Sequence, residues 1–300
     1  MLRRVGVFFA VNAAVIITIS LLLNLTPLGD YVTAAGAGNR GLLVFCALFG
    51  VGGSFISLQI SRWSAKRAMR VALINPHAPR GGVESLLVGR VQNLCAKAGI
   101  TTLPEIGVYQ SPEVNAFATG PSRNKALVAV STGLLERMDD EAVEGVLGHE
   151  IAHIANGDMV TMALVQGVVN TFVMFFARIV THVIDQFLRG DRDGGGLGFF
   201  GYFIVVGVLE TLLFALAWPI IAAFSRWREF RADAGSARFT TPATMVHALE
   251  ALARNTKHFD KQDAALATMK IQGGGGGLWA KLISTHPPIE QRIAALRQIS

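Results

Sequence analysis

The chain has 300 residues, enough for one or two domains, and its composition is that of a membrane protein. Hydrophobic residues make up 51% of it and charged residues only 16%, with a mean hydropathy of +0.44, which argues against a soluble globular protein. The net charge of +6 does not indicate nucleic-acid binding, because the basic residues cluster beside apolar runs as the positive-inside rule expects. The two cysteines, Cys46 and Cys95, provide no disulfide framework and suit a reducing compartment.

Two apolar runs open the chain, at residues 5–25 and 41–60, and each is about long enough to cross a bilayer as a helix. A cleaved signal peptide is the competing interpretation of the first run, but that run is long for a signal and lacks a good cleavage site. Basic residues flank both outer ends, namely Arg3, Arg4, Arg62, Lys66, Arg67 and Arg70. The runs therefore predict a transmembrane hairpin with both ends in the cytoplasm. Small residues in the second run favour close helix packing: Gly50, Gly52, Gly53 and Ser54.

The polar block that follows is predicted to mix helix and strand. Apolar residues at helical spacing predict a helix over 83–98. Segments 105–110, 115–119 and 127–131 are rich in strand-forming residues and predict a small sheet. Asp139 or Asp140 then caps a helix with acidic residues in its first turn.

That helix carries the pattern His149-Glu150-Ile151-Ala152-His153. Four residues are slightly more than one helical turn, so both imidazoles project from one face and can hold one zinc ion. Glu150 lies beside that position and can take a proton from the attacking water. A polar patch on an amphipathic helix is the alternative, since the pattern fixes only three positions.

Two more apolar runs, at 159–184 and 197–224, are separated by a linker rich in glycine and charged residues. They contain Arg178, His182 and Glu210, which are costly in lipid. We expect the two basic residues to snorkel or to face the bundle, and Glu210 to make a buried polar contact with another helix. A membrane scaffold or transporter with an inert zinc site would use the same residues, and it is the alternative from another functional class.

The last block begins with basic residues and is predicted to be helical, with helices from Pro242 to about residue 255 and from Pro288 onward. A catalytic zinc ion usually has three protein ligands, so a third must come from outside the histidine pair. Glu229 is the candidate, and Asp233 on the same helix face could accept the outer N–H of a ligand histidine. Glu210 and Asp158 compete less well, and a solvated helix face paired with arginines remains the alternative for Glu229 and Asp233.

The chain resembles the HtpX-type membrane zinc metalloproteases, which are related to the CAAX prenyl proteases. The resemblance covers nearly the whole chain and the order of its membrane runs. It is carried by four motifs: Asn115-Ala116-Phe117-Ala118, His149 to His153, Ser225 to Asp233, and Ser284-Thr285-His286-Pro287-Pro288 with Arg292.

The resemblance implies a mainly α membrane protein with four transmembrane helices and a cytoplasmic α+β zincin-like protease domain with a small sheet. The expected parts are an N-terminal transmembrane hairpin (1–68), a cytoplasmic protease part (69–158), a second hairpin (159–224) and a cytoplasmic helical part (225–300).

The resemblance also implies site roles. It makes Glu229 the third zinc ligand beside His149 and His153, with Asp233 in contact with a ligand. It makes the strand edge Asn115 to Ala118 a place where substrate can add as an extended strand. His286 and Arg292 lie near the active centre, where either can stabilise the oxyanion, although a structural role is open for both.

The implied function is that of a zinc metalloendopeptidase of the cell inner membrane, active on the cytoplasmic side in quality control and stress response. Its expected partners are polypeptide substrates such as misfolded membrane proteins, the lipid bilayer and other quality-control proteases, and not nucleic acid. A prenyl-protein CAAX protease is the alternative enzyme, disfavoured because four crossings are fewer than a membrane-enclosed chamber needs.

Overall fold

The computed structural model describes residues 38–190, 196–262 and 284–299, which form mostly helices and one small mixed sheet. The first expected apolar run, 5–25, and the glycine-rich stretch 273–277 lie outside the described residues. The chain divides into two compact units. The helical unit takes its described residues from Met1–Ile56 and Ala163–Ile221, and the sheet unit from Ser57–Met162 and Ala222–Ser300.

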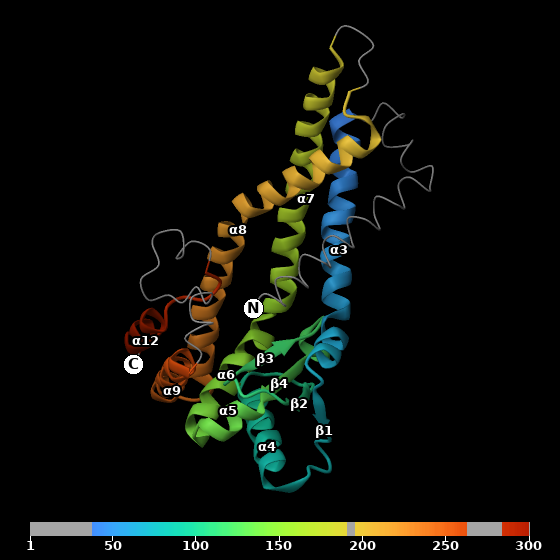
Figure 1. Cartoon of the computed structure of the whole chain (residues 1–300). Coiled ribbons are helices and arrows are strands. Elements are labelled where there is room, and N and C mark those ends of the chain that lie inside the picture. Colours follow the sequence, from blue (N-terminus) through green and yellow to red (C-terminus); the bar gives the residue numbers. More distant parts are fainter. Residues whose placement is uncertain (1–37, 191–195, 263–283, 300) are drawn as a thin grey trace. The chain divides into compact units, whose positions relative to one another are not determined.

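The sheet unit contains four strands in the order β1-β2-β4-β3 (Figure 1). They are β1 (Ala72–Ile74), β2 (Glu105–Tyr109), β3 (Ala116–Thr119) and β4 (Leu127–Ser131). β2 and β4 are parallel, while β1 and β3 pair antiparallel at the two edges. The sequence predicted the last three strands within one residue. It missed β1, because a three-residue edge strand is too short to show an alternating pattern.

Helices α4 (Gly81–Lys97) and α6 (Asp140–Asn156) pack with the sheet, and the short α5 (Thr132–Arg137) connects β4 to α6 (Figure 1). One continuous apolar core joins them and includes fully buried side chains from each layer: Val91, Leu94, Ile106, Val128, Leu147, Ile151 and Ile154. The cysteine of this core, Cys95, is a free thiol, as is Cys46, so the prediction of no disulfide is confirmed for this pair. Burial raises the pKa of the Cys95 thiol to about 11.

Asp139 caps α6, as the sequence predicted for one of two acids. Its Oδ1 accepts a hydrogen bond of 2.8 Å from the Ala142 N–H, and its Oδ2 pairs with His247 at 2.8 Å. The pKa of the Asp139 carboxyl is lowered, chiefly by the backbone hydrogen bond and then by His247. A depressed pKa means that this stabilisation is present above the ordinary value of 3.8 and is lost as pH falls through the lower value of the folded state.

Replacing Asp139 by alanine should therefore lower the free energy of unfolding by about 1 kcal/mol at neutral pH, because an orphan N–H of α6 loses its acceptor. The control is Asp140→Ala, which removes only an exposed ion pair to Arg90 and should change stability by less than about 0.5 kcal/mol. Denaturant unfolding in detergent micelles at neutral and acidic pH measures both. Equal losses in the two variants would contradict the capping role.

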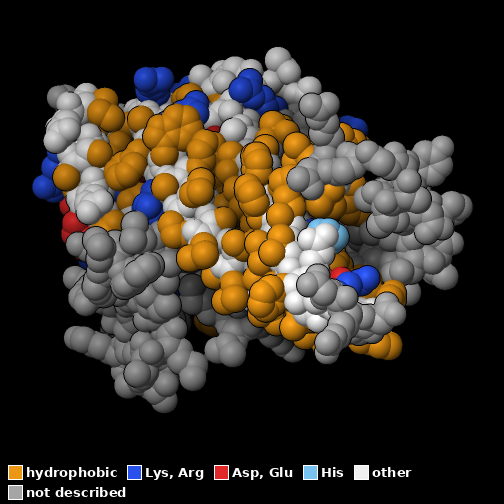
Figure 2. All heavy atoms as spheres, turned by 90° about the horizontal axis from the view of Figure 1, so that it is seen from above, with side chains coloured by type: hydrophobic (Ala, Val, Ile, Leu, Met, Phe, Trp, Pro, Cys, Tyr) orange, Lys and Arg blue, Asp and Glu red, His pale blue; other side chains and the backbone are white. Residues whose placement is uncertain are grey.

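Three helices of the described residues are long and apolar enough to cross a membrane. They are α3 (Gly38–Ala68), α7 (Asp158–Arg189) and α8 (Gly198–Phe239). Many of their large apolar side chains are exposed, and Figure 2 shows hydrophobic side chains over much of the described surface in that view. The second, third and fourth predicted spans thus correspond to helices. The first, at residues 5–25, lies in the part of the chain that the structure does not describe.

Within the helical unit, α3 and α7 approach closely at glycines. A Cβ on Gly50 would lie 2.5 Å from Thr171 Oγ1, and one on Gly167 would lie 3.0 Å from the Val51 Cα. The predicted packing role is confirmed for Gly50. At Gly52 a Cβ would meet no atom of the described residues within 4 Å.

Arg178 on α7 and Glu210 on α8 form a buried ion pair in this unit. The Arg178 Nη1 donates to Glu210 Oε1 at 2.7 Å and to the Met174 carbonyl at 3.0 Å. The guanidinium also lies 5.9 Å from the ring centroid of Phe45 on α3. The expected buried contact of Glu210 with another helix is confirmed, and Arg178 faces the bundle.

The change Arg178→Met should destabilise the helical unit by about 3–5 kcal/mol, because it leaves the Glu210 carboxylate buried without its partner. The double variant Arg178→Met/Glu210→Leu should recover most of that loss, since no charge is then stranded. Thermal unfolding in detergent micelles compares the two. A single variant as stable as the parent, or a double variant no better than the single, would show that the pair is not desolvated.

The C-terminal part forms α9 (Pro242–Gln262) and α12 (Ile289–Arg297), which pack on each other through Leu249, Leu296 and their neighbours. The Thr241 Oγ1 accepts a hydrogen bond of 3.0 Å from the Thr244 N–H and so caps the start of α9. The fourth apolar run was expected to end near residue 224, yet α8 continues to Phe239. The apolar run ends near residue 224 as expected. The helix continues because residues 225–239 keep helical propensity and bury one face in the sheet unit.

Candidate active site

The site is built where α6 and the C-terminal half of α8 pack without intervening side chains. A Cβ on Gly148 would lie 2.5 Å from Ser236 Oγ, and a Cβ on Gly235 would lie 2.7 Å from the Ala152 Cβ. The Ser236 hydroxyl donates to the Gly145 carbonyl at 2.9 Å and holds the two backbones together. This close approach brings α8 side chains to the face of α6 that carries the two histidines.

His149, His153 and Glu229 converge at this contact. One ligand atom from each lies within 4.8 Å of the other two. The His149 Nε2 is 3.6 Å from Glu229 Oε2, the His153 Nε2 is 3.4 Å from Glu229 Oε1, and the two Nε2 atoms are 3.0 Å apart. Glu229 is 3% exposed and His149 is 8% exposed, so these groups do not form a solvated helix face.

A carboxylate contacts the Nδ1 atom of each histidine, on the side of the ring away from Nε2. The His149 Nδ1 donates to Asp233 Oδ1 at 2.9 Å, and the His153 Nδ1 donates to Asp158 Oδ2 at 2.6 Å. Both carboxylates are 2% exposed. Because an ionised carboxylate only accepts hydrogen bonds, each Nδ1 atom carries a proton, and each Nε2 atom presents a lone pair whenever its ring is neutral.

Two lone pairs that face each other at 3.0 Å, with a carboxylate alongside, repel unless a cation lies among them. Two imidazole nitrogens and one carboxylate oxygen are also a ligand set that a divalent transition metal prefers. The residues therefore fit a metal ion, held by the three side chains and supported by Asp233 and Asp158.

The electrostatics of the site favour positive charge at this point. Burial is the largest single influence on both imidazoles and lowers their pKa, but the carboxylates outweigh it. Hydrogen bonds to Asp158 and Glu229 raise the pKa of His153 to about 9. Those to Asp233 and Glu229 raise the pKa of His149. The carboxylates that hold the rings therefore also attract a cation to the Nε2 atoms.

Arg292 and His286 reach the site from the chain around α12. Arg292 is 8% exposed, and its guanidinium donates two hydrogen bonds, of 2.7 and 2.6 Å, to the Asp233 carboxylate. Its Nη2 and the His149 Nδ1 are 3.3 Å apart because both bind Asp233 Oδ1. His286 pairs through Nδ1 with Glu229 Oε2 at 2.9 Å, while most of its ring stays exposed.

The remaining predicted site residues lie around the same helix. Glu150, next to His149 on α6, is half-buried. Ala116, Phe117 and Ala118 belong to β3, which occupies the sheet edge and contacts α6 (Figure 1). Asn115 precedes β3, and its backbone N–H donates to the Ser131 hydroxyl at 3.1 Å.

The sequence interpretation weighed Asp158 only as a weaker candidate for the third ligand and missed its contact with His153. Gly157 adopts a left-handed conformation with φ 70° and ends α6, so a new helix, α7, begins about one turn after the second histidine. Asp158 then stands at the first turn of α7 and reaches the His153 ring. The detectable signal was the pair Gly157-Asp158 one turn beyond His153.

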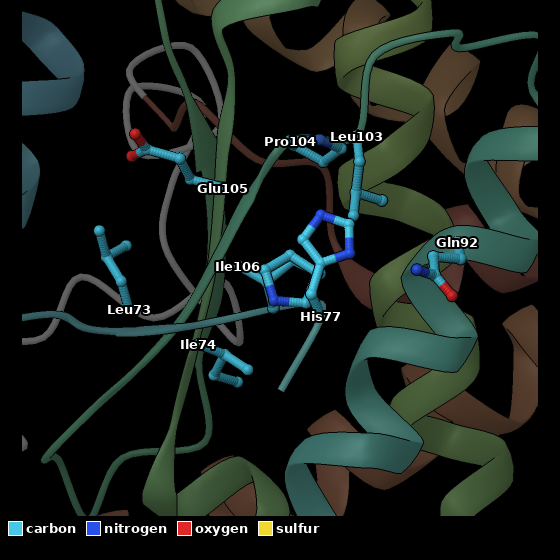
Figure 3. A pocket seen from close by; sticks show the side chains of 9 residues that line it. Leu73, Ile74, His77, Gln92, Leu103, Pro104, Glu105 and Ile106 are labelled. Carbon is cyan, nitrogen blue, oxygen red and sulfur yellow. The ribbon is translucent and has the colours of Figure 1, made fainter. Parts of the chain in front are cut away.

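A separate pocket opens between β1, β2 and α4, and its lining contains none of the predicted site residues. Figure 3 shows the His77 ring lying between Gln92 and Ile106. Glu105, also in the lining, pairs with Arg62 and Lys66. We therefore assign the chemistry to the histidine helix rather than to this pocket.

Comparisons with known proteins identify the family of the chain. Residues 85–300 match the family model described as Peptidase family M48. The chain is 48% identical over 297 residues to "Protease HtpX" of Stenotrophomonas maltophilia, with 99% of this chain and 98% of that one aligned. It is 46% identical over 298 residues to "Protease HtpX homolog" of Thiobacillus denitrificans, with 99% and 100% aligned.

A solved structure has a similar fold. The crystal structure of S. mikatae Ste24p superposes with a TM-score of 0.65 at 17% sequence identity, covering 99% of this chain and 65% of that one. At this identity the likeness concerns the fold alone. The sequence relatives are proteases, so a non-proteolytic scaffold is not favoured. On the family match and the relatives together, the chain belongs to peptidase family M48 and is a membrane metalloprotease.

Proposed function

We propose that the chain is a zinc-dependent endopeptidase whose metal ligands are His149, His153 and Glu229. The observation that carries the proposal is the convergence of two imidazole Nε2 atoms and a buried carboxylate. A zinc ion supplies Lewis acidity at this position, which makes water acidic and a peptide carbonyl electrophilic.

The side chains of the chain divide the remaining work. Glu150 takes a proton from the attacking water as the oxygen bonds to the carbonyl carbon, and then delivers that proton to the amine as the C–N bond breaks. His149 and His153 keep a fixed tautomer because Asp233 and Asp158 accept their Nδ1 protons. The β3 edge, from Asn115 to Ala118, offers backbone groups that can pair with an extended substrate.

We assign different roles to His286 and Arg292. The exposed ring of His286, already beside Glu229, can donate a hydrogen bond to the carbonyl oxygen as it gains negative charge. Arg292 is buried and bound to Asp233, so we propose that it positions the Asp233–His149 pair rather than contacting substrate.

We further propose that the active site faces the cytoplasm of a cell with an inner membrane. The basic residues that follow the apolar parts of α3 and α8 support this orientation. The protease would then remove misfolded membrane proteins during stress, in the company of other quality-control proteases. On this view residues 69–158 and 225–300 act together as the protease part, and residues 1–68 and 159–224 as the membrane hairpins.

The test is hydrolysis of casein, an unfolded protein substrate, by the full chain in detergent micelles. We expect one zinc ion per chain by elemental analysis, loss of cleavage on chelation, and recovery on adding zinc. Cleavage that survives complete removal of metal would contradict the proposal, as would a fully zinc-loaded protein that cleaves nothing.

Asp158→Asn tests the support of His153 separately. Asparagine keeps the shape of the side chain but weakens acceptance from the Nδ1 proton, so zinc affinity should fall about 10–100-fold. Competition with a chromogenic chelator measures the affinity. Asp185→Asn, which alters an acid near the far end of α7, is the matched control and should leave zinc affinity at the parent value. An unchanged affinity in Asp158→Asn would mean that Asp158 does not tune the ligand.

A further inference from the structure

Two exposed tryptophans in the sheet unit each precede by four residues an arginine that stacks on them. The Arg67 guanidinium carbon lies 5.2 Å from the centroid of Trp63 on α3, and that of Arg231 lies 4.6 Å from Trp227 on α8. Trp63 is 59% exposed and Trp227 is 50% exposed. Neither indole is needed to fill the core, so the repeated arrangement calls for a partner outside the chain.

Each pair follows directly on an apolar stretch of its own helix. Trp63 comes three residues after the run 41–60, and Trp227 comes three residues after the run 197–224. A helix rises about 1.5 Å per residue, so each indole lies about 5 Å beyond the apolar stretch along its helix axis. The polar layer of a bilayer is about 5–8 Å deep on each side, and indoles favour that layer.

On α3, two basic residues near Arg67 already form ion pairs with the sheet. Arg62 Nη1 lies 3.3 Å from Glu105 and Lys66 Nζ lies 2.9 Å from the same carboxylate. Arg67 is exposed, and no ion pair within the described part of the chain engages it. Its charge is therefore available to an external anion.

On α8, too, the neighbouring arginines have partners within the chain. Arg226 donates to the Ser284 carbonyl at 2.6 Å, and Arg228 donates to the Asp158 carbonyl at 3.3 Å. Arg231 is exposed, stacks on Trp227 and, as far as the described residues extend, has no carboxylate partner. Stacking orients the guanidinium without neutralising it, which leaves its N–H groups free for a phosphate.

We propose that the Trp63–Arg67 and Trp227–Arg231 pairs bind the phosphates of anionic phospholipids and hold the metal centre at the depth of the lipid headgroups. Glu229 lies between Trp227 and Arg231 on α8, buried on the inner face of the same turns. Its Cα atom is therefore about 3 Å along the helix axis from the Cα atoms of both. The depth of the metal centre rests on the proposed function, whereas the lipid contact itself does not.

The depth is measured by quenching of tryptophan fluorescence in lipid nanodiscs. The full chain carries four tryptophans, so variants that keep only Trp63, only Trp227 or only Trp218 are made by changing the others to phenylalanine. All are made in a Glu150→Gln background so that hydrolysis plays no part. The nanodiscs contain phosphatidylcholine brominated either near the glycerol or near the end of the acyl chain.

Trp63 and Trp227 should be quenched several-fold more by bromine near the glycerol than by bromine at the chain end. Trp218 is the matched control, because it lies nine residues before Trp227 on the same helix and about 13 Å deeper along the axis. It should show the reverse preference. Quenching of Trp63 and Trp227 only by a water-soluble quencher, or most strongly by chain-end bromine, would overturn the proposed depth.

The phosphate contact is measured by comparing the binding of phosphatidylglycerol and phosphatidylcholine to the detergent-solubilised chain by native mass spectrometry. Each of Arg67→Gln and Arg231→Gln should reduce the preference for the anionic lipid about fivefold. Arg238→Gln, an exposed arginine two turns beyond Arg231 on α8, should not change it. Equal loss in Arg238→Gln, or no loss in the first two, would overturn specific headgroup binding.

These outcomes are independent of proteolysis. A chain that binds zinc and cleaves casein but fails the quenching test refutes the lipid proposal alone. A chain that passes the quenching and lipid-binding tests but holds no zinc refutes the proposed function and leaves the headgroup contact standing.

Discussion

Glu150→Gln should bind zinc as tightly as the parent protein and hydrolyse casein about 10²–10⁴-fold more slowly. Glutamine has the size of glutamate but cannot accept the proton of the attacking water. The zinc content should not change, because Glu150 is not among the three groups that converge on the metal position. Elemental analysis and initial rates on the same preparation provide both numbers.

Glu144→Gln is the matched control for that experiment. Glu144 lies on the same helix, nearly two turns before Glu150, and is not part of the convergent cluster. Its rate and zinc content should equal those of the parent. If Glu150→Gln cleaved casein at the rate of the control, the general-base role would be refuted even though the metal site remained intact.

Glu229→Gln should lower the zinc affinity more than about 100-fold and abolish hydrolysis as a consequence. Changing a residue that only supports a ligand already lowers metal affinity about 10–100-fold, so removing a charged ligand should lower it further. Among the described residues Glu229 is the only carboxylate in the convergent group, because Asp158 and Asp233 contact the Nδ1 atoms on the other side of the histidine rings. Titration with a competing chelator measures the affinity.

Two controls make the Glu229→Gln result interpretable. Far-ultraviolet circular dichroism shows whether α6 and α8 remain folded, because the neutral amide also weakens the contact to His286. Glu250→Gln removes a half-exposed carboxylate on α9 that pairs with Arg297 and should retain full zinc affinity. Stoichiometric zinc of parent affinity in a folded Glu229→Gln protein would exclude Glu229 as a ligand.

Local patterns predicted the local structure. The helical spacing of His149 and His153, the cap at Asp139 and the long apolar runs each depend on residues that are close in sequence. Those that fall within the described residues therefore appear in the fold where they were expected. The strand β1 escaped prediction because its pairing with β2, not its own three residues, makes it a strand.

The site itself could be predicted only in part. Spacing placed Glu229 and Asp233 on one helix face but left a solvated face as an equal alternative. The residues made Glu229 a candidate ligand, and the family resemblance favoured that role over the solvated face. What decides between them is the close packing of Gly148 and Gly235, 87 residues apart in the chain, which no periodicity encodes. The contact of Asp158 with His153 likewise depends on a left-handed turn at Gly157.

The three-dimensional packing also clarified the role of Arg292. Sequence left it as either a catalytic aid or a partner of a carboxylate. Its burial and its two hydrogen bonds to Asp233 support the second, and they connect α12 to the histidine helix through one carboxylate. His286, from the same motif, remains exposed and is the better placed of the two to meet substrate.

The most direct test of the metal centre is anomalous diffraction at the zinc absorption edge from crystals of the full chain grown with zinc. We predict one strong anomalous peak bonded, at about 2 Å, to His149 Nε2, His153 Nε2 and a Glu229 carboxylate oxygen. A zinc peak bound elsewhere, with these three side chains turned away from one another, would contradict the account.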